Sequence, residues 1–401
     1  MTAALSRSRP AARAAALAAA LALAACGRAG DDAVTLWHAY SGDERAALED
    51  EAARWNRDHP ERTVRLVAVP YDAFADKITS AIPNGNGPDL FVYSHDRVGD
   101  WVASGLLEPI EFWIDGDTAA TWADDALAAM AYRGSLWGLP LAVKSLALYV
   151  RTDLVAAAPT TTDELFAMAP GLRARGVFPL SYPVDDLYGH AAWLHGFGGQ
   201  TLDADGRAAI ATPEAVAAAA FARELVVREV VPRDADVALT ATLFNEGKAA
   251  MAMSGPWFQG DIAGGVPWTV TTLPVVSATG RPAAPFLGAE GVLMSARARD
   301  KDAAIAVMLA LAGDDAAGRR ARRARQVVPN PRAYDGDLAA DPVLDAFRRQ
   351  LDASVAMPAV PLMRAVWTPY KNALGSVVSG ASRPADALDR VASEIRTYEA
   401  P

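Results

Sequence analysis

The chain has 401 residues, and 52% of them are hydrophobic, which is enough for two domains with cores of ordinary size. Lys and Arg number 38 against 48 Asp and Glu, a formal charge of −10. This balance argues against nucleic acid as a partner, because proteins that bind it neutralise phosphates with basic side chains.

The N-terminal residues predict a targeting segment. Three arginines before residue 14 precede an apolar stretch too short to span a bilayer. It ends in Leu23-Ala24-Ala25-Cys26-Gly27, which matches the bacterial lipobox, whose cysteine becomes the lipidated first residue of the mature protein. We predict a lipoprotein signal peptide over residues 1–25, a lipidated tether over residues 26–33, and lipid anchoring to a membrane in the periplasm or at the cell exterior. An ordinary secretory signal with an incidental cysteine is the alternative.

From residue 34 onward the pattern predicts alternating strands and helices. The expected strands are 34–37, 63–69 and 90–93, and the expected helices follow the turn at 40–42 and cover 71–82. Ser41 and Glu44 have the spacing of a capping box. The order strand, helix, strand, helix, strand predicts a parallel sheet with right-handed crossovers.

An apolar run over residues 146–150 begins the predicted second domain. Thr161 with Glu164, and Thr212 before Pro213, mark the starts of two helices. The remaining expected elements are a hairpin over 132–140, helices over 240–246, 301–312 and 385–399, and strands over 249–253, 268–273 and 291–294. The arginine run 319–325 predicts a solvated helix face, with headgroup or partner contact as the alternative.

Three polar or aromatic side chains lie at the end of the strand predicted over 90–93 or shortly after it. At the C-terminal edge of an open α/β sheet, where ligands sit, Tyr93 would present a ring face, Asp96 an acceptor and Arg97 a planar set of donors. These groups suit a sugar, which has apolar C–H faces and a rim of hydroxyls. Trp257 and Trp367 lie at loop entries marked by Gly or Pro, and we expect both to stack on the ligand.

Catalytic and cofactor signatures are weak. The five histidines form no zinc pattern and no phosphate-binding loop is present, so we expect no metal and no cofactor. A glycoside hydrolase would need two carboxylates across a glycosidic bond, and Asp96 with Asp186 is the pair that leaves this alternative open. We expect a binding protein that is not an enzyme.

Several separated motifs together resemble those of the maltose/maltodextrin-binding proteins, the substrate-binding lipoproteins of bacterial ABC importers within family 1 of the extracellular solute-binding proteins. The resemblance covers nearly all of the mature chain. The motifs are Gly87-Pro88-Asp89 through His95-Asp96-Arg97, Ser104-Gly105-Leu106-Leu107, Pro140-Leu141-Ala142-Val143, Phe244-Asn245-Glu246-Gly247-Lys248 through Gly255-Pro256-Trp257, and Met357-Pro358-Ala359-Val360-Pro361 through Trp367.

The resemblance implies an α/β, type II periplasmic-binding-protein fold: two lobes, each a mostly parallel sheet flanked by helices, joined by crossing hinge strands. It implies an N-terminal lobe of residues 34–142 and 288–338 and a C-terminal lobe of residues 143–287 and 339–401. It also implies an oligosaccharide held in the interlobe cleft by hinge closure, delivery to permease subunits, and a monomeric protein. Another oligosaccharide or a polyol, for example trehalose or sucrose, is the alternative ligand.

By position, the resemblance implies ligand-binding roles for Tyr93, Asp96, Arg97, Lys144, Asp186, Tyr188, Trp257, Trp367 and Lys371. The chain departs from the family pattern at Tyr93, Lys144, Thr368 and Lys371, where the family has Trp, Glu, Tyr and Arg. Lys144 replaces an acceptor by a donor, so we expect it to pair with Asp186 or Asp96 and to shift the preference among α-glucosides.

Overall fold

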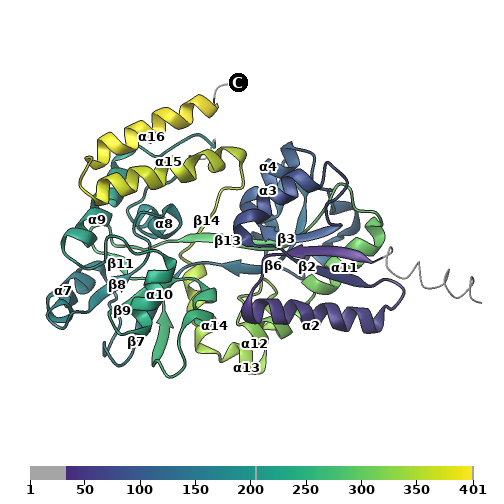
Figure 1. The fold of residues 1–401 in the computed structure, drawn as a ribbon, viewed down its shortest axis with the longest axis horizontal. Coiled ribbons are helices and arrows are strands. Elements are labelled where there is room, and N and C mark those ends of the chain that lie inside the picture. The colour runs from purple at the N-terminus through teal and green to yellow at the C-terminus, as the bar shows by residue number, and fades with distance from the viewer. Residues whose placement is uncertain (1–32, 204–205, 400–401) are drawn as a thin grey trace, which may run out of the picture.

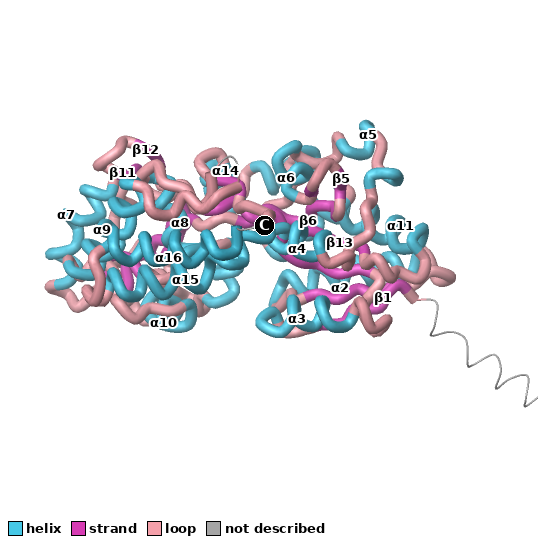
Figure 2. Tube along the Cα trace, turned by 90° about the horizontal axis from the view of Figure 1, so that it is seen from above, coloured by secondary structure: helices cyan, strands magenta, loops and turns pink. Residues whose placement is uncertain are grey.

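The computed structural model describes residues 33–203 and 206–399. In this part of the chain the elements form two lobes, joined by strands that run from one lobe to the other (Figure 1). Figure 2 shows the same two groups of helices and strands from above. The predicted signal peptide, Cys26 and nearly all of the predicted tether lie outside the described residues. No helix in the described ranges combines the length and the apolar character that crossing a membrane requires.

The first sheet contains the strands β1 (Val34–His38), β2 (Val64–Ala68), β3 (Leu90–Ser94), β6 (Gly138–Lys144), β13 (Phe286–Met294) and β14 (Val355–Ala356). β1 pairs in parallel with both β2 and β3, and the connections run through α2 (Gly42–Asp58) and α3 (Tyr71–Ala81). This confirms the parallel arrangement predicted for the first three strands. β13 is antiparallel to both β3 and β6.

The second sheet has the order β10 (Trp268–Thr271), β7 (Ala147–Arg151), β9 (Ala249–Ser254), β8 (Phe178–Ser181). β8 and β9 are parallel, but β7 is antiparallel to both β9 and β10. The expectation of a mostly parallel sheet is therefore wrong for this lobe. The reason is that β7 follows β6 after only two residues, so β6 sets its direction and no crossover helix does.

The helices cover these sheets and form the rest of each lobe. They are α4 (Val98–Ala103), α5 (Gly116–Ala119), α6 (Asp124–Ala129), α7 (Thr162–Arg173), α8 (Leu187–Gly196), α9 (Pro213–Val227), α10 (Val237–Asn245), α11 (Lys301–Ala312), α12 (Asp314–Ala324), α13 (Gly336–Ala339), α14 (Pro342–Leu351), α15 (Pro361–Val378) and α16 (Pro384–Glu399). Short 3-10 helices cover η1 (His95–Arg97), η2 (Glu111–Trp113), η3 (Pro256–Asp261) and η4 (Pro331–Ala333). The hairpins are β4 (Ala131–Tyr132) with β5 (Ser135–Leu136) and β11 (Val275–Val276) with β12 (Arg281–Pro282).

Side chains cap two of the helices whose starts were predicted. The Thr161 hydroxyl accepts from the N–H of Glu164 at the start of α7, and the Thr212 hydroxyl accepts from the N–H of Ala215 at the start of α9. The capping box predicted for α2 is wrong. Ser41 is the N-cap residue there but its side chain makes no capping hydrogen bond, and Glu44 turns toward Lys144 instead.

The chain passes between the lobes at the ends of strands. It leaves the first sheet at Lys144, which is opposite Gly288 of β13, and the return passage begins where β13 starts. α15 packs on α8 and α9, and α16 packs on α15 and α9, in the second lobe above the crossing strands in Figure 1. The division of residues between the lobes stays a prediction.

Asp89 of the Gly-Pro-Asp motif holds the first lobe together. Its carboxylate accepts from the backbone N–H of Thr35 at 2.8 Å and from the Nη2 of Arg299 at 2.7 Å. Burial alone would raise the pKa of Asp89, but the hydrogen bonds from Arg299 and Thr35 outweigh it and lower the pKa to about 2. Asp89 thus joins β1, β3 and the segment after β13.

The arginine run on α12 is not wholly solvated. Arg320 is 1% exposed and donates to the carbonyls of Leu311 and Leu141, so the prediction of a solvated face is wrong for this residue. Burial lowers the pKa of its guanidinium. Arg319 pairs with Glu51 of α2 at 2.6 Å, which ties α12 to α2. The neighbouring arginines are exposed, as the sequence predicts.

Candidate functional site

Tyr93 lies at the C-terminal end of β3, but it is only 7% exposed and is packed among other rings. Tyr71 stacks on it at 5.6 Å between ring centroids and Phe74 at 5.2 Å, and Trp101 packs edge-on at 5.1 Å. The prediction that Tyr93 presents a ring face is therefore wrong. Tyr71, at the start of α3, is 60% exposed and is the accessible ring at this position. The sequence analysis did not consider Tyr71 as a ligand-binding residue, and the signal was a tyrosine at the first position of the helix predicted over 71–82.

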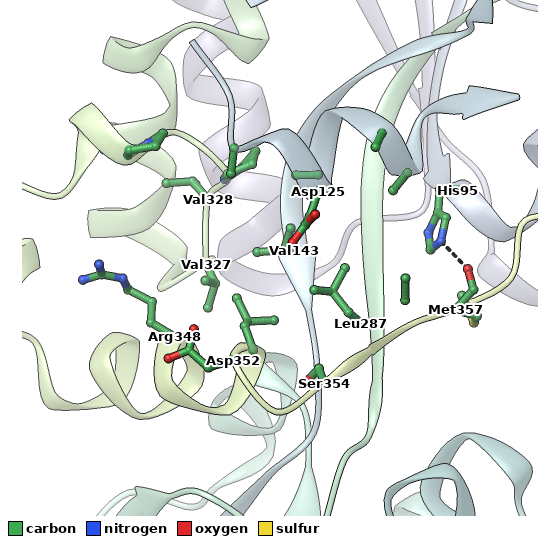
Figure 3. A pocket seen from close by; sticks show the side chains of 18 of the residues that line it. His95, Asp125, Val143, Leu287, Val327, Val328, Arg348, Asp352, Ser354 and Met357 are labelled. Carbon is green, nitrogen blue, oxygen red and sulfur yellow. Dashed lines mark hydrogen bonds between the residues drawn. The ribbon is translucent and has the colours of Figure 1, made fainter. Parts of the chain in front are cut away.

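His95 fixes the turn that carries Asp96 and Arg97. Its Nδ1 accepts from the backbone N–H of Ala289 on β13 at 3.0 Å, and its Nε2 donates to the carbonyl of Met357 at 2.9 Å (Figure 3). The ring is 1% exposed. Because Ala289 lies on a strand that joins the lobes, His95 connects the turn that carries Asp96 and Arg97 to one of the strands that run between the lobes.

Asp96 and Arg97 leave this turn in different electrostatic settings. Burial raises the pKa of Asp96, although hydrogen bonding from Ser94 and the nearby His95 and Arg97 act against it. The guanidinium of Arg97 lies 3.7 Å from Asp100, which also pairs with Arg364 of α15 at 3.4 Å. A carboxylate and a guanidinium thus stand side by side on the first lobe, within reach of the second.

Lys144 at the end of β6 lies between two carboxylates that the sequence analysis did not expect as its partners. Its Nζ is 2.9 Å from Glu290 on β13 and 3.4 Å from Glu44 on α2. The expected pairing with Asp186 or Asp96 is therefore wrong. Burial would lower the pKa of Lys144, but Glu290 and Glu44 outweigh it and raise the pKa. The signal for Glu290 was a carboxylate inside an otherwise apolar strand.

The second lobe contributes a row of aromatic rings. The ring centroids of Trp257 on η3 and Tyr188 on α8 are 6.4 Å apart, and those of Tyr188 and Phe286 at the start of β13 are also 6.4 Å apart. The row ends at Trp367 on α15, whose ring centroid is 6.1 Å from that of Phe286. Trp257 is 36% exposed, and the Nζ of Lys144 lies 5.9 Å from its ring. The row therefore begins beside the charged groups of the first lobe.

Asp186 and Tyr188 are positioned by the start of α8. Asp186 is the N-cap, and its carboxylate accepts from the N–H of Tyr188 at 2.7 Å, so part of its acceptor capacity serves the helix. Burial raises the pKa of the Tyr188 hydroxyl; Lys144 opposes this, and the carboxylates of Asp96, Asp186 and Glu290 add to it. Tyr188 is therefore close to charged side chains of the first lobe and to Asp186 of the second.

We call the group formed by Asp96, Lys144, Asp186, Tyr188, Trp257 and Glu290 the interlobe cluster. Arg97 adjoins it through the same turn as Asp96. Trp367 joins it through Phe286, and Lys371 lies one turn further along α15 and is exposed. Within the described residues, no three His, Cys, Asp or Glu side chains are arranged to hold a metal ion. The cluster offers ring faces, acceptors and donors, the groups that bind a neutral polyhydroxylated molecule.

A cavity of about 1000 Å³ lies on the other face of the crossing strands (Figure 3). Val143 and Leu287 line it, and Val143 precedes Lys144 on β6. Because successive side chains of a strand point to opposite faces, this cavity is separated from the interlobe cluster by the strands themselves. Its only ring besides that of His95 among the described lining residues is Tyr334, so it lacks the aromatic platforms of the cluster.

Comparison with known proteins gives one family and consistent relatives. The model of the bacterial extracellular solute-binding protein family matches residues 39–318. The maltotriose-binding protein of Pyrococcus abyssi is 26% identical over 360 residues, which are 87% of this chain and 78% of that protein. The galactooligosaccharide-binding protein of Bacillus subtilis is also 26% identical over 360 residues, covering 86% of this chain and 85% of that protein.

Among solved structures, the maltotriose-binding protein of Thermus thermophilus with bound maltotriose superposes with a TM-score of 0.83. It is 26% identical in sequence, and the match covers 92% of this chain and all of that one. The expected two-lobe fold is confirmed by this similarity. The residue roles at the interlobe cluster remain predictions.

Proposed function

Because this chain belongs to the family of bacterial extracellular solute-binding proteins, we propose that it binds a maltodextrin-type oligosaccharide between its lobes and delivers it to the permease of an ABC importer. The observation that carries the proposal is the interlobe cluster, in which a row of rings from the second lobe meets charged hydrogen-bonding groups of the first. The maltotriose-binding relatives support the choice of ligand. The protein acts as a receptor without turnover.

The two lobes bind the sugar together when the hinge closes around it. Trp257 and Tyr188 stack on sugar faces from one side, while Asp96 and Arg97 bond hydroxyls from the other. Each ring contributes about 0.5–1.5 kcal/mol beyond area burial, and each hydrogen bond to a charged group about 1.5–3 kcal/mol. A few of each, less ordering costs, reach the roughly −8 kcal/mol of micromolar affinity.

The proposal includes the location of the protein. The lipobox at Cys26 supports a lipoprotein anchored to a membrane by its N-terminus, and the extracellular solute-binding family supports a location in the periplasm or at the cell exterior. Two acyl signals are needed for stable anchoring, and a lipidated N-terminal cysteine supplies them. Metabolic labelling with a palmitate analogue tests this, since Cys26→Ser removes the label if the assignment is right.

A galactooligosaccharide is the second candidate ligand, because a relative with that specificity is equally similar in sequence. Lys144 is a reason to test a galactooligosaccharide beside the maltodextrins, since it places a hydrogen-bond donor where the maltodextrin-binding pattern has an acceptor. We propose that Lys144 shifts the ranking of sugars. Its ion pairs with Glu44 and Glu290 present all three groups together.

The test is calorimetric titration of the folded protein with maltose, maltotriose, trehalose, sucrose and a β-galactotriose. We expect saturable micromolar binding of the α-1,4 glucosides, and Trp257→Ala should weaken it by at least about tenfold, or about 1.4 kcal/mol. Trp55 on α2 is partly buried and lies outside the cluster, so Trp55→Ala should leave the sugar affinity of the folded protein unchanged. Preference for β-galactotriose supports the second candidate. Consumption of the sugar during the titration would contradict the receptor assignment and support a hydrolase.

A further inference from the structure

Four exposed arginines lie together at the end of the first lobe where β1 begins, and we call them the arginine patch. Arg54 and Arg57 are on the last turns of α2, Arg62 comes shortly before β2, and Arg65 is on that strand. β2 is the last strand in the order of its sheet, so one of its edges has no neighbouring strand. The patch therefore belongs to an outer margin of the lobe.

The two stretches that carry the arginine patch are fixed to each other by hydrogen bonds. The indole N–H of Trp55 donates to the carbonyl of Arg62 at 2.6 Å. The side chain of Asn56 donates to the carbonyl of Val64 at 3.0 Å and accepts from its N–H at 2.7 Å. The end of α2 and the start of β2 thus form one rigid surface, and the four guanidinium groups extend from it.

The arginine patch lies directly beside the start of the described chain. The N–H of Val34 donates to the carbonyl of Thr63 at 2.8 Å, and Val34 is opposite Val64 in the sheet. Ala33 is seven residues after Cys26, and seven fully extended residues span at most about 25 Å. With a lipid on Cys26, the patch is therefore held close to the surface of the bilayer.

The charge of the arginine patch is not balanced by ion pairs. Within the described ranges none of the four guanidinium groups pairs with a carboxylate, whereas Arg319 close by pairs with Glu51. Residues 54–65 hold four arginines against Asp58 and Glu61, an excess of two positive charges in a chain of formal charge −10. A guanidinium without a carboxylate partner is suited to bind a phosphate through two parallel hydrogen bonds.

Resting on the lipidation of Cys26 in the proposed function, we infer that the arginine patch is a contact surface for anionic lipid headgroups. It holds this end of the first lobe against the membrane that carries the anchor. The anchor supplies the attachment and keeps the patch at a high local concentration near the headgroups, so a few arginine–phosphate contacts are enough to set the orientation.

This orientation keeps the sugar site clear of the headgroups. α2 begins beside the interlobe cluster, where Glu44 contacts Lys144, and its 17 residues run about 25 Å to the arginine patch (Figure 1). The membrane contact and the cluster are thus at opposite ends of the same helix, and the second lobe is free to move.

The experiment measures how close each end of the anchored protein comes to the membrane. The lipidated protein is reconstituted into phosphatidylcholine vesicles with or without phosphatidylglycerol, together with a lipid that carries a nitroxide on its headgroup. A fluorescent probe is attached to a cysteine introduced by Pro60→Cys, within the patch, or by Ala381→Cys, between α15 and α16 of the other lobe; both positions are exposed. The nitroxide quenches a probe that lies near the headgroups.

Two variants with the same change of net charge are compared. The test variant is Arg54→Gln/Arg57→Gln/Arg62→Gln/Arg65→Gln. The matched control makes the same replacement at four exposed arginines after α7, after α9 and on α16, namely Arg175, Arg233, Arg390 and Arg396. Thermal unfolding of both variants at the wild-type temperature shows that they are folded.

With phosphatidylglycerol present, we expect at least about threefold stronger quenching at position 60 than at position 381 in the wild type and in the matched control. The test variant should bring the two positions within about 1.5-fold of each other, and so should the removal of phosphatidylglycerol or a high salt concentration.

Equal quenching at the two positions in the wild type overturns the inference, and so does a test variant that keeps the difference. An equal loss in the matched control also overturns it, because net charge and not the patch would then set the orientation. Failure of the proposed anchoring is recognised separately: a chain without an introduced cysteine would take up the thiol-reactive probe at Cys26, which a lipidated cysteine does not allow, and the inference would fall with it.

Discussion

Lys144 is the residue whose surroundings say most about the binding chemistry. An ammonium group has three donors, and Glu290 and Glu44 take two of them, which leaves one for a ligand. The same ion pairs direct the two carboxylates toward the cluster. Lys144 therefore acts with its partners as one unit, and a change in it alters all three groups.

Lys144→Met should lower the free energy of unfolding by about 1–3 kcal/mol at pH 7, because two half-buried carboxylates lose their cation. Urea unfolding at pH 7 measures this.

The double variant Lys144→Met/Glu290→Gln should recover part of the loss, since one of the two unpaired charges is gone. Lys248→Met is the control, because Lys248 pairs with Glu246 on the surface, where such pairs contribute about 0–1 kcal/mol. A Lys144→Met protein as stable as wild type would show that the ion pairs do not hold the cluster together.

For single residues, the sequence predicts which side chains belong to the site better than it predicts which side chains they contact. Asp96 and Trp257 were predicted from turns and motifs and Tyr188 from the family resemblance, and the structure brings them into one cluster. Glu44 and Glu290 were missed because their partner comes from a different element, and a single sequence does not show which elements become neighbours. The same limit explains why Tyr93 was assigned the exposed ring that belongs to Tyr71.

At the scale of elements, α8 positions Tyr188 and is itself sensitive to acid. His190 on this helix is fully buried beside Tyr370, with 5.9 Å between ring centroids. Burial, and then the nearby His195, lower the pKa of His190 to about 3. Its neutral form is the one that the folded protein accommodates.

Because the folded pKa is lower than the unfolded value of 6.5, the unfolded state binds more protons between pH 6.5 and about 3. The wild type should therefore lose stability as the pH falls below 6.5, by up to about 1.4 kcal/mol per pH unit from this group. His190→Leu should remove this contribution and retain about 2 kcal/mol more of its pH 7 stability at pH 5 than wild type does.

Urea unfolding of both proteins between pH 5 and 7 measures the difference. His59→Gln serves as the control, because His59 lies at the end of α2, partly exposed and stacked on Trp55. An identical pH slope for His190→Leu and wild type would show that His190 is not the buried base that the packing indicates.

Helix starts are the most predictable part of the elements, because capping is local. Thr161 and Thr212 cap α7 and α9 as expected. Strand direction in the second sheet was not predictable in the same way, since it depends on β7 entering from β6. Likewise β13 begins at Phe286, five residues before its predicted start. The first half of this strand was not predicted because its glycines and Glu290 interrupt the apolar pattern.

At the scale of the whole molecule, the crossing strands carry the functional groups themselves. Lys144 ends β6, Glu290 lies in the middle of β13, and His95 bonds to Ala289 beside it. A change in the angle between the lobes therefore moves the cluster directly. The two-lobe fold was predictable from separated motifs, whereas this coupling depends on contacts between β3, β6 and β13 that only the structure shows.

Small-angle X-ray scattering tests whether both lobes hold the sugar at once. The protein is measured alone and saturated with maltotriose, with the Trp257→Ala variant at equal sugar concentration for comparison. We expect the radius of gyration of the wild type to fall on saturation, and to fall less in the variant because the second lobe has lost its main ring platform. Calorimetrically verified binding with an unchanged radius of gyration would contradict the account, since one lobe would then hold the sugar alone.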